Sequence, residues 1–253
     1  MAVPFLKEIG LVLFVAFCIL MFVGSMLLVR RAAKQNKDLK NLKVYNVSMA
    51  IFVLFLAIAY AIRIYFMFFI PNTDAEFIEL NTSTERSAAG LPSFVAGNRV
   101  GLIQVLWQWH MGLIFTGIGF LMFATEYLMF KKTHYLLTVI AFVTAPLILI
   151  FPYDLAHKVY FVMYIAPVLW LLVYIMVAKN TAGSLRKNAV MLIVGVLIFI
   201  LGVFLNSDTV RGWLFGESGL QNIDLSAIFS VWISPVVLII GLTVTIMAIY
   251  NKF

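Results

Sequence analysis

An arginine and a histidine have the strongest chemical character of the residues inside the apolar stretches of this sequence. Arg63 lies in AYAIRIYFMFFIP, and His110 lies in VLWQWHMGLIF. Each is about five residues from the middle of its apolar segment, which places both side chains roughly 7 to 8 Å from the centre of a membrane. An arginine at that depth normally faces a cavity or a partner. We therefore expect Arg63 and His110 to share one layer and to belong to a binding site.

Further polar and aromatic side chains are expected at a similar height. Ser226, Ser230 and Ser234 recur at every fourth residue, so they occupy one helix face. Together these groups predict an outward-opening polar pocket for a small anionic or zwitterionic ligand, and the positive charge of the arginine favours an anion. The candidate ligand-binding residues are Arg63, Trp107, Gln108, His110, Tyr160, Tyr164, Ser230, Trp232 and Ser234.

Each of these groups also has a purely structural interpretation. The Arg63 side chain can extend to the outer membrane interface. A serine stripe is often helix-packing glue, and tyrosines or tryptophans near helix ends often form an aromatic belt. Glu126, at the inner end of the segment that holds His110, is interpreted as an interfacial carboxylate paired with nearby basic loops. The pattern leaves the structural and functional interpretations open.

Catalytic and metal chemistry have little support. Cys18 is the single cysteine, so an intrachain disulfide and a cysteine metal cluster are excluded. His110 and His157 are expected at depths that differ by roughly 10 Å, which is a poor arrangement for one haem or metal ion. We expect no cofactor and no metal site, and we disfavour an enzymatic activity without excluding it.

The elements that must position these residues are membrane-spanning helices. The chain has 253 residues, of which 64% are hydrophobic and 11% charged, whereas soluble domains carry about 25% charged residues. No remaining segment is long enough for a soluble output domain. The sequence predicts an all-α integral membrane protein, a single seven-transmembrane-helix bundle over residues 1–253. The expected helices are 9–29, 44–70, 100–130, 135–151, 158–178, 189–206 and 225–250.

Basic residues predict the orientation of the bundle. They concentrate in alternate loops, which belong on the cytoplasmic side, so the N-terminus is expected outside and the C-terminus inside. Residues 71–98 then form an extracytoplasmic loop, which contains a glycosylation sequon at Asn81. The loop after the first helix either fixes topology or binds anionic lipid or a cytoplasmic partner. Its candidate contact residues are Arg30, Arg31, Lys34 and Lys37.

Seven helices with an outside N-terminus match the topology of rhodopsins and G-protein-coupled receptors, but the motifs of those proteins are missing. Residues 225–250 contain no lysine for a retinal Schiff base. The segment ATEYLMFKK lacks Asp-Arg-Tyr, and TIMAIYNKF lacks Asn-Pro-x-x-Tyr. The likeness is therefore architectural, and topology alone does not give function.

The predicted function is that of a receptor- or sensor-like protein of the cell membrane. It would bind a small ligand in the outer half of the bundle. A transporter, or a structural subunit of a larger membrane complex, is the alternative. The expected partners are the lipid bilayer, a cytoplasmic or membrane protein and a small molecule, but not nucleic acid, because the topology accounts for the net charge of +7.

Overall fold

The computed structural model describes residues 2–35, 40–71, 98–129, 134–152, 155–156, 159, 165–205 and 228–250. Within these ranges the secondary structure is helical and no strand occurs. The chain is therefore an all-α protein, as the sequence predicted. Its long apolar helices indicate a membrane protein.

The first four predicted segments form three long helices and one shorter helix. α1 spans Ala2–Lys34, and α2 spans Lys40–Ile64 and continues as the π-helix η2 over Tyr65–Phe69. α4 spans Asn98–Met129, and α5 spans Leu136–Ile150. These bounds agree with the four predicted segments to within a few residues, except that α1 continues past its apolar run at both ends.

The remaining segments form three helices. α7 spans Ile165–Asn180, α8 spans Gly183–Leu205, and the π-helix η5 over Ile228–Ile233 leads into α11 over Ser234–Tyr250. The change from π-helix to α-helix falls one residue before Pro235. A proline lacks the backbone N–H that an α-helix needs there. α8 begins six residues before the predicted start, because basic and polar residues extend the helix beyond its apolar run.

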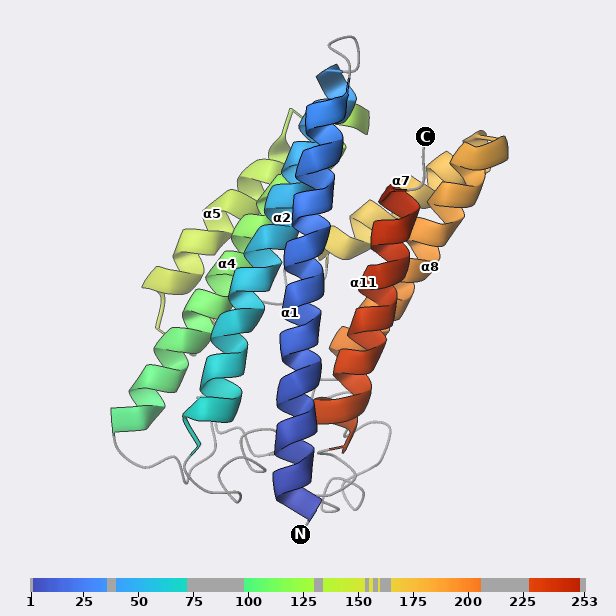
Figure 1. The fold of residues 1–253 in the computed structure, drawn as a ribbon. Helices are drawn as coiled ribbons and strands as arrows, with labels where there is room; N and C mark the ends of the chain where they lie inside the picture. Colours follow the sequence, from blue (N-terminus) through green and yellow to red (C-terminus); the bar gives the residue numbers. More distant parts are fainter. Residues whose placement is uncertain are drawn as a thin grey trace.

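Six of the described helices are arranged as a closed ring. Neighbouring contacts run from α1 to α2, α4, α7, α8, α11 and back to α1. α5 lies outside this ring and packs on α4 (Figure 1). α1 begins at one end of the ring, and its last residues lie at the other end with the start of α2 and the C-terminal end of α11.

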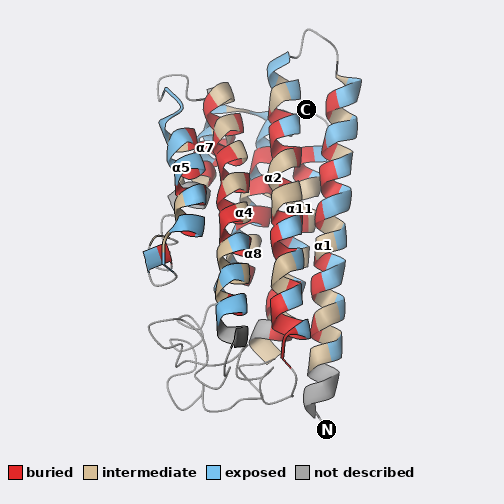
Figure 2. Cartoon of the chain, turned by 90° about the vertical axis from the view of Figure 1, so that its left-hand side faces the viewer, coloured by how far each residue is buried: buried red, intermediate tan, exposed pale blue. Residues whose placement is uncertain are grey.

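The faces of α1 show why the ring suits a membrane. Phe14, Phe17 and Met21 recur at spacings of three and four and are fully buried. Val12 and Ile19 on other faces are apolar but exposed, at 66% and 59%. The same division into buried inner and exposed outer faces recurs around the bundle (Figure 2). An apolar outer surface of this extent is stable in lipid rather than in water.

Five described helices are long and apolar enough to cross a membrane. They correspond to α1, α2 with η2, α4, α8, and α11 with the end of η5. α5 has 15 residues and α7 has 16. At 1.5 Å per residue these helices are about 23 Å long, shorter than the roughly 30 Å hydrocarbon core of a bilayer. The predicted start of the helix at 158–178 lies largely outside the described residues.

Glycines permit the close contact between α8 and α11. A Cβ atom added to Gly241 would lie 2.4 Å from the backbone nitrogen of Phe199. One added to Gly202 would lie 2.8 Å from the side chain of Leu238. These helices therefore pack backbone against backbone, as small residues allow in membrane bundles.

Candidate ligand site

Arg63 is held against aromatic rings near the C-terminal end of α2. Its guanidinium carbon lies 5.9 Å from the centre of the Phe14 ring and 5.8 Å from that of Tyr60. Its Nε donates a hydrogen bond of 3.0 Å to Met67 Sδ, one turn further along. Both rings are within the distance at which a cation is attracted to an aromatic face. α1 and α2 thus share the environment of the charge.

His110 lies on α4 beside the same tyrosine. Its ring is 4% exposed, and its Nδ1 lies 2.7 Å from the carbonyl oxygen of Ala59 on α2. A carbonyl oxygen only accepts hydrogen bonds, so Nδ1 carries a proton and donates it. The His110 ring also meets Tyr60 edge-on at 5.6 Å between centroids.

Tyr60 therefore joins the two residues that the sequence expected to share a layer. We call Phe14, Tyr60, Arg63 and His110 the outer polar layer, after the side of the membrane that the sequence predicted for Arg63 and His110. Tyr60 is 5% exposed and stacks or meets edge-on with rings of α1 and α4. The layer brings α1, α2 and α4 together around one positive charge.

Gln108, also proposed for this pocket, contacts a different helix. Its Nε2 donates to the carbonyl oxygens of Ile148, at 3.1 Å, and Phe151, at 2.7 Å, at the end of α5. The Ile148 carbonyl would normally accept the N–H of residue 152, but that residue is Pro152. Gln108 thus satisfies a carbonyl that the proline leaves without its helical donor.

Ser234 also bonds within the protein. It is fully buried, and its Oγ donates a 2.8 Å hydrogen bond to the Gly202 carbonyl on α8. Trp107 and Trp232 are half-buried and pack against the apolar core. The side chains of the remaining candidates lie outside the described residues: Tyr160, Tyr164 and Ser230.

Glu126 has a structural role that the sequence analysis missed. It is fully buried, and its carboxylate accepts hydrogen bonds from the backbone N–H groups of Leu137 and Thr138, at 3.1 and 2.9 Å. The Thr138 hydroxyl is a third donor. Tyr135, the N-cap residue of α5, has a left-handed backbone and provides no side-chain cap. Glu126 of α4 thus caps the neighbouring helix, and the short connection between the two segments was the available clue.

The opposite end of the bundle is basic. Arg30, Lys34, Lys179, Arg186 and Lys187 are exposed there, at the ends of α1, α7 and α8 (Figure 1). Arg31 is half-buried, and Lys37 lies outside the described residues. The proposed contact residues that are described thus lie at the end that carries the C-terminus.

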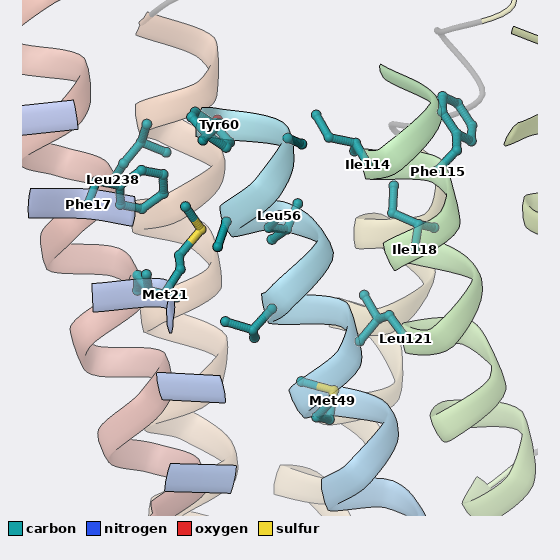
Figure 3. Close-up of a cluster of buried hydrophobic side chains, with 14 of the residues drawn as sticks. Phe17, Met21, Met49, Leu56, Tyr60, Ile114, Phe115, Ile118, Leu121 and Leu238 are labelled. Carbon is teal, nitrogen blue, oxygen red and sulfur yellow. The ribbon is translucent and has the colours of Figure 1, made fainter. Parts of the chain in front are cut away.

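A cavity of about 190 Å³ lies inside the ring. Each ring helix contributes to its wall, for example through Leu28, Leu56, Ile118, Trp170, Phe199 and Leu242. Figure 3 shows Met49, Leu56, Ile114, Ile118 and Leu121 among the buried apolar side chains that gather between α2 and α4.

The cavity lies next to the outer polar layer along the bundle axis, on the side of the basic end. Tyr60 follows the lining residue Leu56 by four residues on α2, and His110 precedes the lining residue Ile114 by four on α4. Residues four apart on a helix share a face, one turn from each other. The bundle therefore has the outer polar layer, with its positive charge, directly beside an apolar cavity.

The described residues contain no group of three or more histidine, cysteine or acidic side chains able to hold a metal ion. No protein-family model, curated protein or solved structure matches the chain.

Proposed function

We propose that the chain is a receptor- or sensor-like protein of the cell membrane that binds a small ligand, an anion in particular, in the outer half of its bundle. It crosses the membrane seven times, with the N-terminus outside and the C-terminus in the cytoplasm. The observation that carries the ligand proposal is the outer polar layer, where Arg63 lies half-buried against Phe14 and Tyr60.

The chemistry of this layer supports an anion. Arginine remains charged at any physiological pH, and its planar group binds carboxylates and phosphates through paired hydrogen bonds. Aromatic walls exclude water and strengthen an electrostatic contact within them. An anion that contacts Arg63 would touch α1, α2 and α4 at once, so its binding would favour one arrangement of these helices.

The distribution of basic residues supports the orientation. The exposed basic side chains of α1, α2, α7 and α8 lie at the end of the bundle with the C-terminus. Lysine and arginine are concentrated on the cytoplasmic side of membrane proteins. Residues 71–98 would then face outward, and Asn81 would become glycosylated in a eukaryotic host. The Asn81→Gln variant should abolish the resulting mobility shift, and an unmodified wild-type chain would contradict the orientation.

Thermal unfolding in an uncharged detergent tests ligand binding. The purified chain is heated with a panel of carboxylates, phosphates and sulfonates, alongside Arg63→Gln and the control Arg186→Gln, which removes an exposed charge at the basic end. A ligand at 100 times its dissociation constant stabilises the folded state by about 2.7 kcal/mol, so a specific anion should raise the melting temperature by several degrees.

The expected result is a shift that Arg186→Gln retains and Arg63→Gln loses. A shift of equal size in all three proteins would contradict a site at Arg63. If no anion changes the melting temperature, the receptor proposal fails, and fixed co-purifying membrane proteins would then support the complex-subunit alternative. Saturable uptake into vesicles would instead support a transporter.

A further inference from the structure

We propose that the cavity inside the ring is a binding site for a hydrocarbon chain. The occupant is the apolar chain of a membrane lipid or of a free amphiphile. This site is distinct from the outer polar layer and does not depend on an anion at Arg63. The cavity lies at the level of Leu56 and Ile118, one or more helical turns from Tyr60 and His110 toward the basic end of the bundle.

The wall of the cavity is suited to hydrocarbon and unsuited to water. Its accessible surface is formed by apolar atoms of the described residues. The hydroxyl of Thr245 belongs to a lining residue but donates to the carbonyl oxygen of Gly241, 2.8 Å away. A buried water needs two to four polar partners, which this wall does not offer.

The size of the cavity makes an occupant of this class favourable. Its volume of about 190 Å³ exceeds the roughly 150 Å³ of a dry apolar cavity that binds benzene. An unfilled void also forfeits the dispersion contacts of all the side chains around it. A chain segment of several methylene groups would restore those contacts without burying a polar group.

The cavity is also accessible from the lipid bilayer, which supplies hydrocarbon chains. Val168 on α7 and Phe204 on α8 line the cavity, yet they are 53% and 38% exposed. The cavity wall therefore extends to side chains of α7 and α8 that are exposed at the outer face of the described bundle. In a bilayer that face meets acyl chains, so the occupant can enter sideways without crossing water.

Photolabelling of the full-length chain in phosphatidylcholine nanodiscs tests the proposal. One arm uses phosphatidylcholine with a diazirine at the end of one acyl chain, and the other uses a free long-chain alkyl diazirine. After irradiation, mass spectrometry locates the labelled residues. Cavity-lining residues such as Leu56 and Ile118 should be labelled in at least one arm. The arm that labels them identifies the source of the hydrocarbon chain.

A matched pair of variants separates the cavity from the lipid-facing surface. Val196 is 7% exposed and lines the cavity, whereas Val194 on the same helix is 44% exposed and outside the described lining. Val196→Phe should lower the labelling of cavity-lining residues at least fivefold, and Val194→Phe should leave that labelling unchanged. If Val196→Phe fails to fold, Val53→Phe, at another buried lining position, fills the cavity from α2.

Labelling confined to residues on the outer surface of the bundle would overturn the proposal. Labelling of cavity-lining residues that the cavity-filling variants do not reduce would also overturn it. Neither result bears on the anion experiment at Arg63. The two sites can therefore fail or succeed independently.

Discussion

Gln108 on α4 donates a hydrogen bond of 2.7 Å to the carbonyl oxygen of Phe151, the C-cap residue of α5. The same amide reaches the Ile148 carbonyl, whose usual donor is missing because residue 152 is proline. One side chain of the ring thus completes the end of the helix that packs outside it. In an apolar environment an unsatisfied carbonyl is costly, so this contact fixes where α5 ends against α4.

Replacing Gln108 with leucine should destabilise the protein by about 1 to 3 kcal/mol, because two carbonyl oxygens lose their donor. Gln104→Leu is the matched control, since Gln104 lies one turn away on α4 and shows no side-chain hydrogen bond within the described structure. Reversible unfolding in mixed micelles with increasing sodium dodecyl sulfate measures both changes. A loss in Gln108→Leu no greater than that in Gln104→Leu would refute the structural role.

Glu126 offers a second test of how α4 holds α5. The Glu126→Ala variant should lose about 1 to 3 kcal/mol, because the first N–H groups of α5 lose a buried, charged acceptor. Glu126→Gln should fall between wild type and alanine, since its amide oxygen still accepts but carries no charge to complement the helix N-terminus. The same micelle unfolding assay applies.

The control for this pair is Glu8→Ala, which removes an exposed carboxylate from α1. It should change stability by less than about 0.5 kcal/mol, as surface substitutions usually do. Equal stability of Glu126→Ala and Glu8→Ala would show that the carboxylate does not act as a cap.

Hydrophobic patterning in the sequence accounts for much of this fold. Apolar runs predict helices well because a membrane helix must keep its backbone bonds internal and its surface apolar. Helix ends are predicted less well, since basic residues such as Arg186 and Lys187 extend α8 past its apolar run. The depth of a residue along its helix is also readable from the sequence, and Arg63 and His110, which were expected at similar depth, both contact Tyr60.

Depth does not reveal direction around the helix, and this limits prediction of the site. Gln108 and His110 are two residues apart, so they point to different neighbours: α5 for Gln108 and α2 for His110. Which neighbour each meets depends on the order of helices around the ring. The cavity is still less predictable, because a void reflects how side chains from six helices fail to fill a shared space.

Close packing of α8 on α11 leads to a third prediction. Gly241→Ala should destabilise the protein by about 1 to 3 kcal/mol, because the new Cβ would lie 2.4 Å from the Phe199 backbone nitrogen and force the helices apart. Gly101→Ala is the control, since its Cβ would meet no described atom within 4 Å. That variant should be neutral or more stable by up to about 1 kcal/mol, because alanine favours helix.

Thermal melting of the two glycine variants under identical detergent conditions gives the comparison. If Gly241→Ala melts with or above Gly101→Ala, the close approach of α8 and α11 is incorrect. Introducing leucine at Gly241 should enlarge the loss further, since the side chain has no space between the backbones.

A tyrosine pair that connects α2 to α7 supplies the last prediction. The hydroxyls of Tyr45 and Tyr174 are hydrogen-bonded to each other, and the two side chains are 7% and 8% exposed. Removing one hydroxyl leaves the other buried without this partner, whereas removing both leaves no polar group to satisfy. Tyr45→Phe and Tyr174→Phe should each lose about 1 to 3 kcal/mol, and the double variant should lose less than the sum of the two.

The double-mutant cycle is measured by micelle unfolding, with Tyr135→Phe as the control for an exposed hydroxyl. Strictly additive losses would mean that the two hydroxyls do not interact. A positive coupling would establish that α7 is held against α2 across the basic end of the ring. That contact matters for the ring as a whole, because α7 is the helix that joins α4 to α8 and so closes the wall around the cavity.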